Sequence, residues 1–108
     1  MGSRTHEHHG QLLKELNEER LAALTRISRT LEQLIAQARE LHDRILATPP
    51  TARERDLAAY HDIRTRARRY RWYLEVQREA LGLRDHRLLD EWYRVPDAII
   101  EPSRGGSA

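Results

Sequence analysis

The sequence contains no cysteine and no phenylalanine, and only one methionine, two tryptophans and four tyrosines among 108 residues. Without cysteine, disulfides and thiol chemistry are excluded. No apolar run approaches the roughly 20 residues that a membrane-spanning helix needs, and residues 1–10 lack the apolar stretch of a secretory signal. We therefore expect one cytoplasmic domain without disulfides and without membrane contact.

Two long stretches, residues 11–47 and 51–81, contain neither proline nor glycine. In the first stretch, leucine, alanine, glutamate, arginine and glutamine dominate, and all five favour helices. Its apolar residues recur at alternating intervals of three and four, the heptad pattern of a helix that packs along one seam: Leu24, Ile27, Leu31, Leu34, Ala38, Leu41 and Ile45. Thr48 and the two prolines after it predict the end of this helix at residue 47.

The second stretch predicts an antiparallel partner for the first helix. Thr51 and Glu54 have the spacing of a capping box, so we expect a helix over residues 52–81 with Gly82 as its left-handed cap. Its seam has the same spacing: Tyr60, Ile63, Ala67, Tyr70, Leu74, Gln77 and Leu81. Because the connection is short, the two helices must lie side by side as a hairpin.

After the hairpin, we expect a short helix over residues 85–93 that Asp85 caps. Its apolar face consists of Leu88, Leu89 and Trp92. Residues 95–108 are predicted to form an extended tail, and residues 1–10 a disordered one. The hairpin domain thus covers residues 11–94. The predicted fold class is all-α: a long, coiled-coil-like antiparallel helical hairpin with a short carboxy-terminal helix.

The apolar stripe of the first helix is wider than one partner helix can cover. Positions beside the seam of a two-stranded coiled coil normally carry charges, yet most of them are small, neutral or apolar in this helix. On the second helix, Trp72 lies opposite the seam, and exposing a tryptophan forfeits about 200 Å² of burial. We therefore expect a homodimer that forms a four-helix bundle, with a monomeric three-helix bundle as the alternative. The candidate dimer interface is Leu16, Leu21, Ile35, Trp72 and Val76.

Residues 64–73 read RTRARRYRWY, with five arginines, three aromatic residues and no acid. On a helical wheel the two tyrosines fall at or beside the seam, which indicates packing rather than base stacking. Four arginines form a stripe of the kind that binds phosphates or an acidic partner: Arg64, Arg68, Arg71 and Arg78. The net charge is only +2 and 18 of the 19 basic residues are arginine, a bias typical of GC-rich genomes. Arginine abundance alone therefore does not indicate nucleic-acid binding.

Motifs that carry catalysis or bind cofactors are absent from the sequence. His6, His8 and His9 lie in the expected disordered tail, where nothing fixes a ligand geometry. Neither a Glu-x-x-His nor a His-Glu-x-x-His pair occurs, and no glycine-rich loop is placed to hold phosphate. We expect no catalytic residue, no cofactor and no metal. The alternative is a small helical enzyme with a composite site at a dimer interface.

These features favour a non-catalytic interaction or adaptor protein, small, cytoplasmic and bacterial, that acts as a homodimer. The expected partners are a second copy and another protein. Nucleic acid bound by the arginine stripe of the second helix is the alternative. The candidate partner-binding residues are that stripe and a carboxy-terminal apolar group: Trp92, Tyr93, Val95, Ile99 and Ile100. For the apolar group, the alternative is that it only covers the hairpin.

Overall fold

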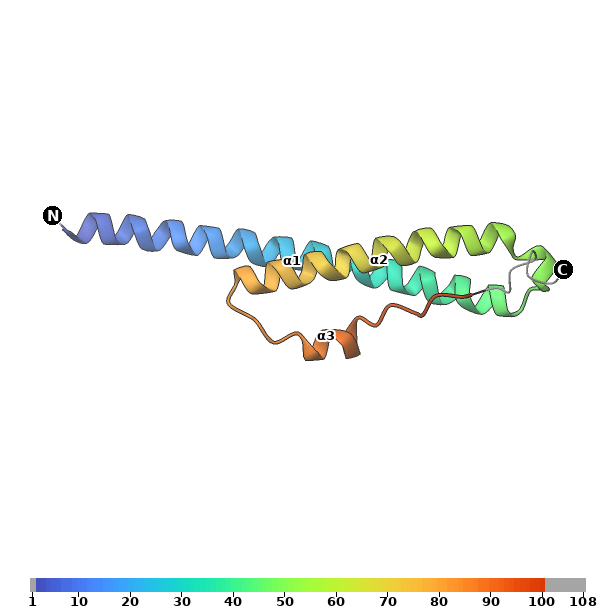
Figure 1. The fold of residues 1–108 in the computed structure, drawn as a ribbon. Coiled ribbons are helices and arrows are strands. Elements are labelled where there is room, and N and C mark those ends of the chain that lie inside the picture. Colours follow the sequence, from blue (N-terminus) through green and yellow to red (C-terminus); the bar gives the residue numbers. More distant parts are fainter. Residues whose placement is uncertain (1, 101–108) are drawn as a thin grey trace.

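The computed structural model describes the backbone of residues 2–100 and the side chains of residues 8–100. In this range the regular elements are α1 (Gly2–Leu46), the 3-10 helix η1 (Pro50–Ala52), α2 (Glu54–Ala80) and α3 (Arg87–Trp92). α1 and α2 pack side by side and antiparallel, and α3 lies along the pair (Figure 1). The molecule is a rod of 82 × 21 × 20 Å. The predicted all-α hairpin is confirmed.

Both predicted seams form the core of the hairpin. Leu31, Ala38 and Ile45 of α1 are fully buried, as are Tyr60 and Ala67 of α2. The buried residues gather in two clusters, one nearer the tip that joins α1 to α2 and one further from it. Apolar burial along the seam stabilises the pair by about 25 cal/mol for each Å² removed from water, so the heptad spacing accounts for the hairpin.

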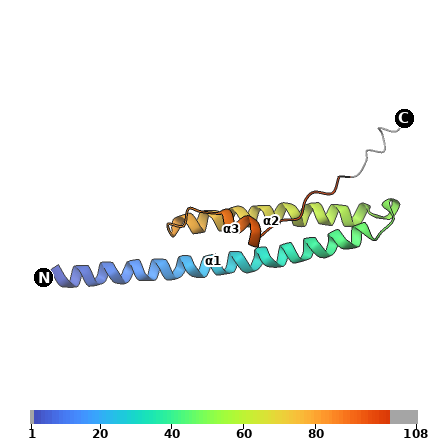
Figure 2. The ribbon, with the colours of Figure 1, turned by 90° about the horizontal axis from the view of Figure 1, so that it is seen from below.

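α1 is much longer than its partner, with 45 residues against 27 in α2. The guanidinium of Arg20 donates to the carbonyl oxygen of Ala80 (3.2 Å), which marks the end of the paired region. Residues 2–19, the projecting segment, extend beyond it as a single helix (Figure 2) of about 27 Å at about 1.5 Å per residue. The predicted disordered tail over residues 1–10 is therefore wrong for residues 2–10. An existing helix propagates at little cost per residue, and no proline stops it.

The connection at the hairpin tip differs from the predicted capping box. Thr51 lies inside η1, and α2 begins only at Glu54, without a side-chain cap. The reason is that Pro49 starts a tight turn, in which its carbonyl oxygen accepts the amide hydrogen of Ala52 (2.9 Å). Thr51 therefore lies two residues before Arg53, the N-cap position of α2, and does not cap the helix.

The carboxy-terminal end of α2 follows the prediction. Gly82 adopts a left-handed φ of 85°, and its amide donates to the carbonyl oxygen of Glu79 while that of Leu83 donates to Arg78, both at 2.9 Å. This pair of bonds is a Schellman motif, which ends a helix and reverses the chain. Residues 85–100, the C-terminal strap, therefore run back along the hairpin toward its tip (Figure 1).

Candidate functional site

Three arginines of the predicted stripe hold the C-terminal strap against α2. Near the tip, Nε of Arg64 donates to the carbonyl oxygen of Pro96 (2.9 Å). Near the other end of α2, the guanidinium of Arg78 donates to the carbonyl oxygen of Asp85 (2.9 Å). Hydrogen bonds from a charged donor are stronger than neutral ones, so these contacts fix the path of the strap at both ends.

Arg71 is the middle arginine of this row, and only 14% of its side chain is exposed. It donates to the carboxylates of Glu75 on α2 and Asp90 on α3, both at 2.7 Å. Arg68 is exposed and forms no hydrogen bond or ion pair within the part of the chain that the structure describes. The stripe is thus divided between three residues that bind the chain's own strap and one that does not.

The helix within the strap contributes one core residue. Leu89 is buried and joins the cluster that α1 and α2 form, whereas Leu88 and Trp92 are exposed. Of the three residues of the predicted apolar face, the hairpin therefore covers only Leu89. α3 has only six residues, less than two turns, so only a single side chain of this face points into the hairpin.

The residues of the predicted carboxy-terminal apolar group also fall into two sets, one packed and one exposed. Tyr93, Val95 and Ile99 pack against the two core clusters and cover the hairpin. Trp92 is exposed, and Ile100 is 90% exposed. Covering the hairpin therefore accounts for three residues of this group and leaves two on the surface.

Tyr60 ties the last part of the strap to the hairpin. Its ring is fully buried, and its hydroxyl donates to the backbone carbonyl oxygen of Asp97 (2.5 Å). Burial raises the pKa of Tyr60 above its ordinary value, and the positive charge of Arg64 opposes this rise. The neutral, hydrogen-bonded phenol is the form that the fold favours.

Asp85 lies two residues before α3, whose N-cap position is occupied by His86 and not by Asp85 as predicted. Its carboxylate accepts the amide hydrogen of Arg87, the first residue of α3 (3.1 Å), and also a bond from the guanidinium of the same residue (2.7 Å). The side-chain and backbone hydrogen bonds from Arg87 lower the pKa of Asp85. Asp85 thus supports the start of this short helix in its ionised form.

The residues of the candidate dimer interface lie on different sides of the hairpin. Ile35 is only 5% exposed and belongs to the cluster that contains Leu89. Ile35 is therefore removed from the candidate dimer interface, because the strap covers the side of the seam on which this residue lies. Leu21 occupies the equivalent heptad position two heptads earlier and is exposed. Leu16 occupies the opposite flank of the seam, is exposed, and lines a groove to which no residue of the strap contributes.

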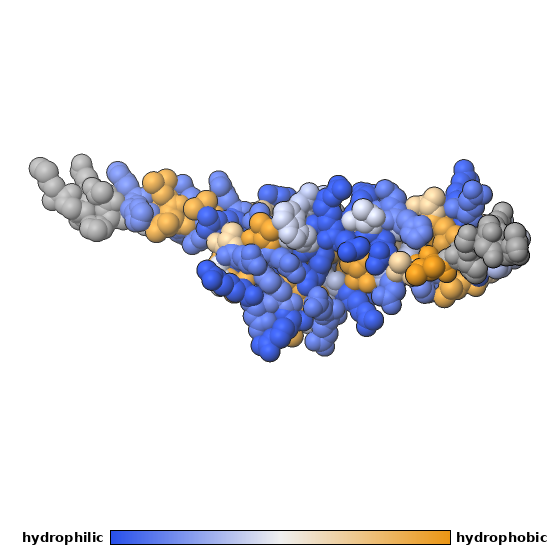
Figure 3. Space-filling view, viewed as in Figure 1, coloured by the Kyte–Doolittle hydropathy of each residue, from blue (hydrophilic) through white to orange (hydrophobic). Residues whose placement is uncertain are grey.

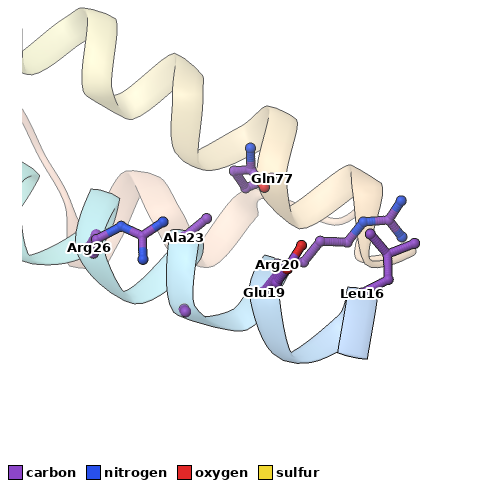
Figure 4. Close-up of a pocket in the computed structure, with 7 residues that line it drawn as sticks. Leu16, Glu19, Arg20, Ala23, Arg26 and Gln77 are labelled. Atoms are coloured by element: carbon purple, nitrogen blue, oxygen red, sulfur yellow. The ribbon is translucent and has the colours of Figure 1, made fainter. Parts of the chain in front are cut away.

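No other segment among the described residues covers the surface away from the strap, and we call this surface the open face. On α1 it comprises Leu12, Leu16, Glu19, Ala22, Ala23 and Arg26. A shallow groove of about 400 Å³ lies there, and Figure 4 shows Gln77 of α2 across from the α1 residues that line it. The groove opens at the end of the hairpin from which the projecting segment leaves.

On α2, the open face carries aromatic and apolar side chains. The ring of Tyr73 lies 5.4 Å from that of Tyr70 and 5.5 Å from that of Trp72. Trp72 is 59% exposed, and Val76, one turn further along the helix, is also exposed. Wheel position places Tyr73 on the flank of the seam that faces away from the strap and Val76 further round on the same side, while Trp72 lies opposite the seam, next to Val76 on the outer side of α2.

The projecting segment adds further apolar surface. Leu12, Leu13 and Leu16 are all exposed on it, and Figure 3 shows apolar surface on this part of α1, beyond the end of α2. Exposed leucines that stand singly are ordinary, but clustered ones mark an interaction surface. These leucines lie within one and a half turns of each other.

Sequence reasoning missed the acidic and small residues of the open face. Glu19 and Arg26 lie one turn to either side of the alanine pair, and neither forms an ion pair within the described residues. An alanine pair flanked symmetrically by opposite charges is a signal that the sequence contains, but attention to the leucine pattern alone overlooks it.

Comparison of the chain with models of protein families, with curated proteins and with solved structures returns no match. Among residues 2–100, no helix is both long and apolar enough to cross a bilayer. No group of three or more histidine, aspartate or glutamate side chains in the described part of the chain is arranged to hold a metal ion.

Proposed function

We propose that the protein is a non-catalytic helical interaction module that acts as a homodimer. The observation that carries this proposal is the open face, where Leu16, Trp72 and Val76 remain exposed although the strap covers the other flank of the same hairpin. Full burial of one such side chain stabilises an assembly by about 1.5–3 kcal/mol. Several of them on one flank favour association over a free monomer.

The strap explains why a single chain leaves this face uncovered. It is one extended segment with one short helix, and its contacts with Arg64, Arg71 and Arg78 commit it to one flank of the seam. The open face therefore needs a second polypeptide. A twofold homodimer is the commonest arrangement that supplies one.

The exposed residues of the strap supply a second surface, for a different protein. Trp92 and Ile100 are exposed on it, and tryptophan is strongly enriched among the residues that dominate binding energy at interfaces. The adaptor role in this proposal is carried by the two surfaces together: the open face for the second copy, and the outer side of the strap for another protein.

Nucleic-acid binding is the second candidate, and one observation favours it. Arg66, Arg68 and Arg69 are exposed on α2. The stripe on which the candidate was based is weakened, because three of its four arginines bind the strap. If this candidate holds, the affinity for a short duplex falls by orders of magnitude between about 50 and 200 mM salt.

Light scattering at about 10 μM chain, well above the dissociation constant of a stable dimer, tests the proposal. We expect twice the chain mass of 12.7 kDa. The double variant Trp72→Glu with Val76→Glu should run as a folded monomer, and Ala36→Glu, at an exposed position on the outer side of α1, should remain dimeric. A monomeric wild-type protein contradicts the homodimer.

A further inference from the structure

We propose that two copies associate through the open face of α1 in an antiparallel arrangement, crossing between Ala22 and Ala23, with Glu19 of each chain facing Arg26 of the other. This inference rests on the proposed homodimer and specifies its contact, its direction and its register. The occupant of the groove in Figure 4 is thus the α1 helix of a second copy.

The crossing point follows from side-chain size. Ala22 and Ala23 are the two small residues of the groove on α1, between Leu16 on one side and Arg26 on the other. Packed helices approach to about 8–10 Å between axes, and the nearest approach requires small side chains at the contact. The alanine pair is the part of this face where another helix can come closest.

The direction follows from charge. Glu19 lies as many residues before the midpoint of the alanine pair as Arg26 lies after it. An antiparallel partner therefore forms two equivalent pairs, Glu19 with the partner's Arg26 and the reverse. A parallel partner instead places glutamate on glutamate and arginine on arginine, which repel. Neither side chain has an ion-pair partner within the described residues of its own chain.

The register also brings together the exposed apolar groups. Leu16 lies as far before the crossing as Arg29 lies after it, so the partner's Leu16 comes to the level of Arg29. The pairing of Arg20 with Ala80 sets the register of α2 against α1 and puts Trp72 at the level of Ser28, one residue from Arg29. The projecting segment of each chain then lies along the aromatic part of the other chain's open face.

The antiparallel register explains the length of the projecting segment. This segment reaches past the end of its own hairpin by about 27 Å at about 1.5 Å per residue. The α2 helix of the same chain is too short to pack against it. In the proposed dimer, this segment occupies the flank of the partner hairpin that the partner's strap leaves open. The central part of the assembly is a four-helix arrangement with the two α1 helices in the middle.

Charge reversal tests this register. We expect Glu19→Arg and Arg26→Glu each to raise the dissociation constant of the homodimer at least about tenfold, because two like-charged pairs then face each other across the contact. An equimolar mixture of the two variants should form heterodimers with an affinity near that of the wild type. Sedimentation velocity with one variant carrying a fluorescent label measures this directly.

Glu32→Arg and Arg55→Glu are the matched controls, since both residues are exposed and lie outside the groove. They should leave dimerisation unchanged, and circular dichroism should show that all variants stay helical. A wild-type dimer that is indifferent to the reversals, or variants that do not recover on mixing, overturns this register but leaves the homodimer standing. A wild-type monomer at about 100 μM overturns both and assigns the open face to another protein.

Discussion

The guanidinium of Arg71 on α2 lies 2.7 Å from the carboxylate of Asp90 on α3, 19 residues further along the chain. The same guanidinium also binds Glu75, so one arginine joins its own helix to the strap. Arginine suits this position because its planar fork presents several donors in fixed directions. The arginine run on α2 suggests the binding of an external anion. At Arg71, however, the arginine holds α3 of the same chain.

Replacing Arg71 by alanine should lower the free energy of unfolding by about 1 kcal/mol, a modest value because the Asp90 carboxylate is itself exposed. Arg68→Ala, a change of the same type at an exposed arginine, should stay within about 0.5 kcal/mol of the wild type. Urea unfolding followed by circular dichroism measures both. Equal losses in the two variants contradict the role of Arg71 in holding the strap.

Two adjacent leucines in α3 provide a second comparison. Leu89 is 2% exposed and Leu88 is 53% exposed. Leu89→Ala should cost about 2–5 kcal/mol because it leaves a cavity where the strap meets the core, while Leu88→Ala should cost less than about 0.5 kcal/mol. Thermal and urea unfolding give the difference. If the two variants unfold alike, the strap does not pack as described.

Two adjacent isoleucines test the other end of the strap. Ile99 packs against the cluster that contains Tyr60, whereas Ile100 points into solvent. Ile99→Ala should therefore destabilise the fold by about 1–2 kcal/mol, less than a fully buried isoleucine. Ile100→Ala should leave stability unchanged and serves as the control in the same unfolding experiment. A larger loss from Ile100 than from Ile99 is incompatible with this packing.

The stability of the fold should depend on the ionisation of Tyr60 at alkaline pH. Since burial raises its pKa in the folded state above the value of about 10 in an unfolded chain, the folded protein holds the phenolic proton more tightly. The stabilisation is complete below about pH 10 and is lost as the pH rises through the folded-state pKa. Tyr60→Phe should lose about 1 kcal/mol at neutral pH with its hydrogen bond and should show a smaller further decline above about pH 10. If the free energies of unfolding of the wild type and of Tyr60→Phe fall in parallel as the pH rises, Tyr60 is not the source of the pH dependence.

The hairpin itself was predictable because its causes are local and periodic. The spacing of Leu31, Ala38 and Ile45 sets the buried side of α1. Gly82 sets the end of α2, since its left-handed conformation is needed for the Schellman bonds. Such features depend on neighbours a few residues away, and a sequence contains that information directly.

The path of the strap was not predictable, because it depends on contacts between residues far apart in sequence. Arg64 and Tyr60 bind backbone carbonyl oxygens at Pro96 and Asp97, and a backbone acceptor leaves no residue-specific pattern. The same limit applies to Ile35, which heptad analysis places beside the seam and which is buried in the cluster that includes Leu89 of the strap. Of the candidate site, sequence analysis identified the arginines but not what they bind.

The choice between the capping box and the observed tip was a competition between two local signals. Thr51 and Glu54 have the spacing of a cap, but Pro49 and Pro50 force a tight turn that includes Thr51. The prolines prevail because they restrict the backbone itself, whereas the cap contributes only about 1 kcal/mol through one side chain.

Disulfide trapping tests the central claim of the account, that a second copy covers the open face, most directly. The sequence has no native cysteine, so Ala23→Cys introduces a single thiol per chain at the proposed crossing, and Ala36→Cys introduces one on the outer, exposed side of α1. Under mild oxidation at about 10 μM chain, Ala23→Cys should form a covalent dimer rapidly while Ala36→Cys remains largely monomeric. Equal and slow cross-linking of the two variants, or faster cross-linking at residue 36, contradicts the account.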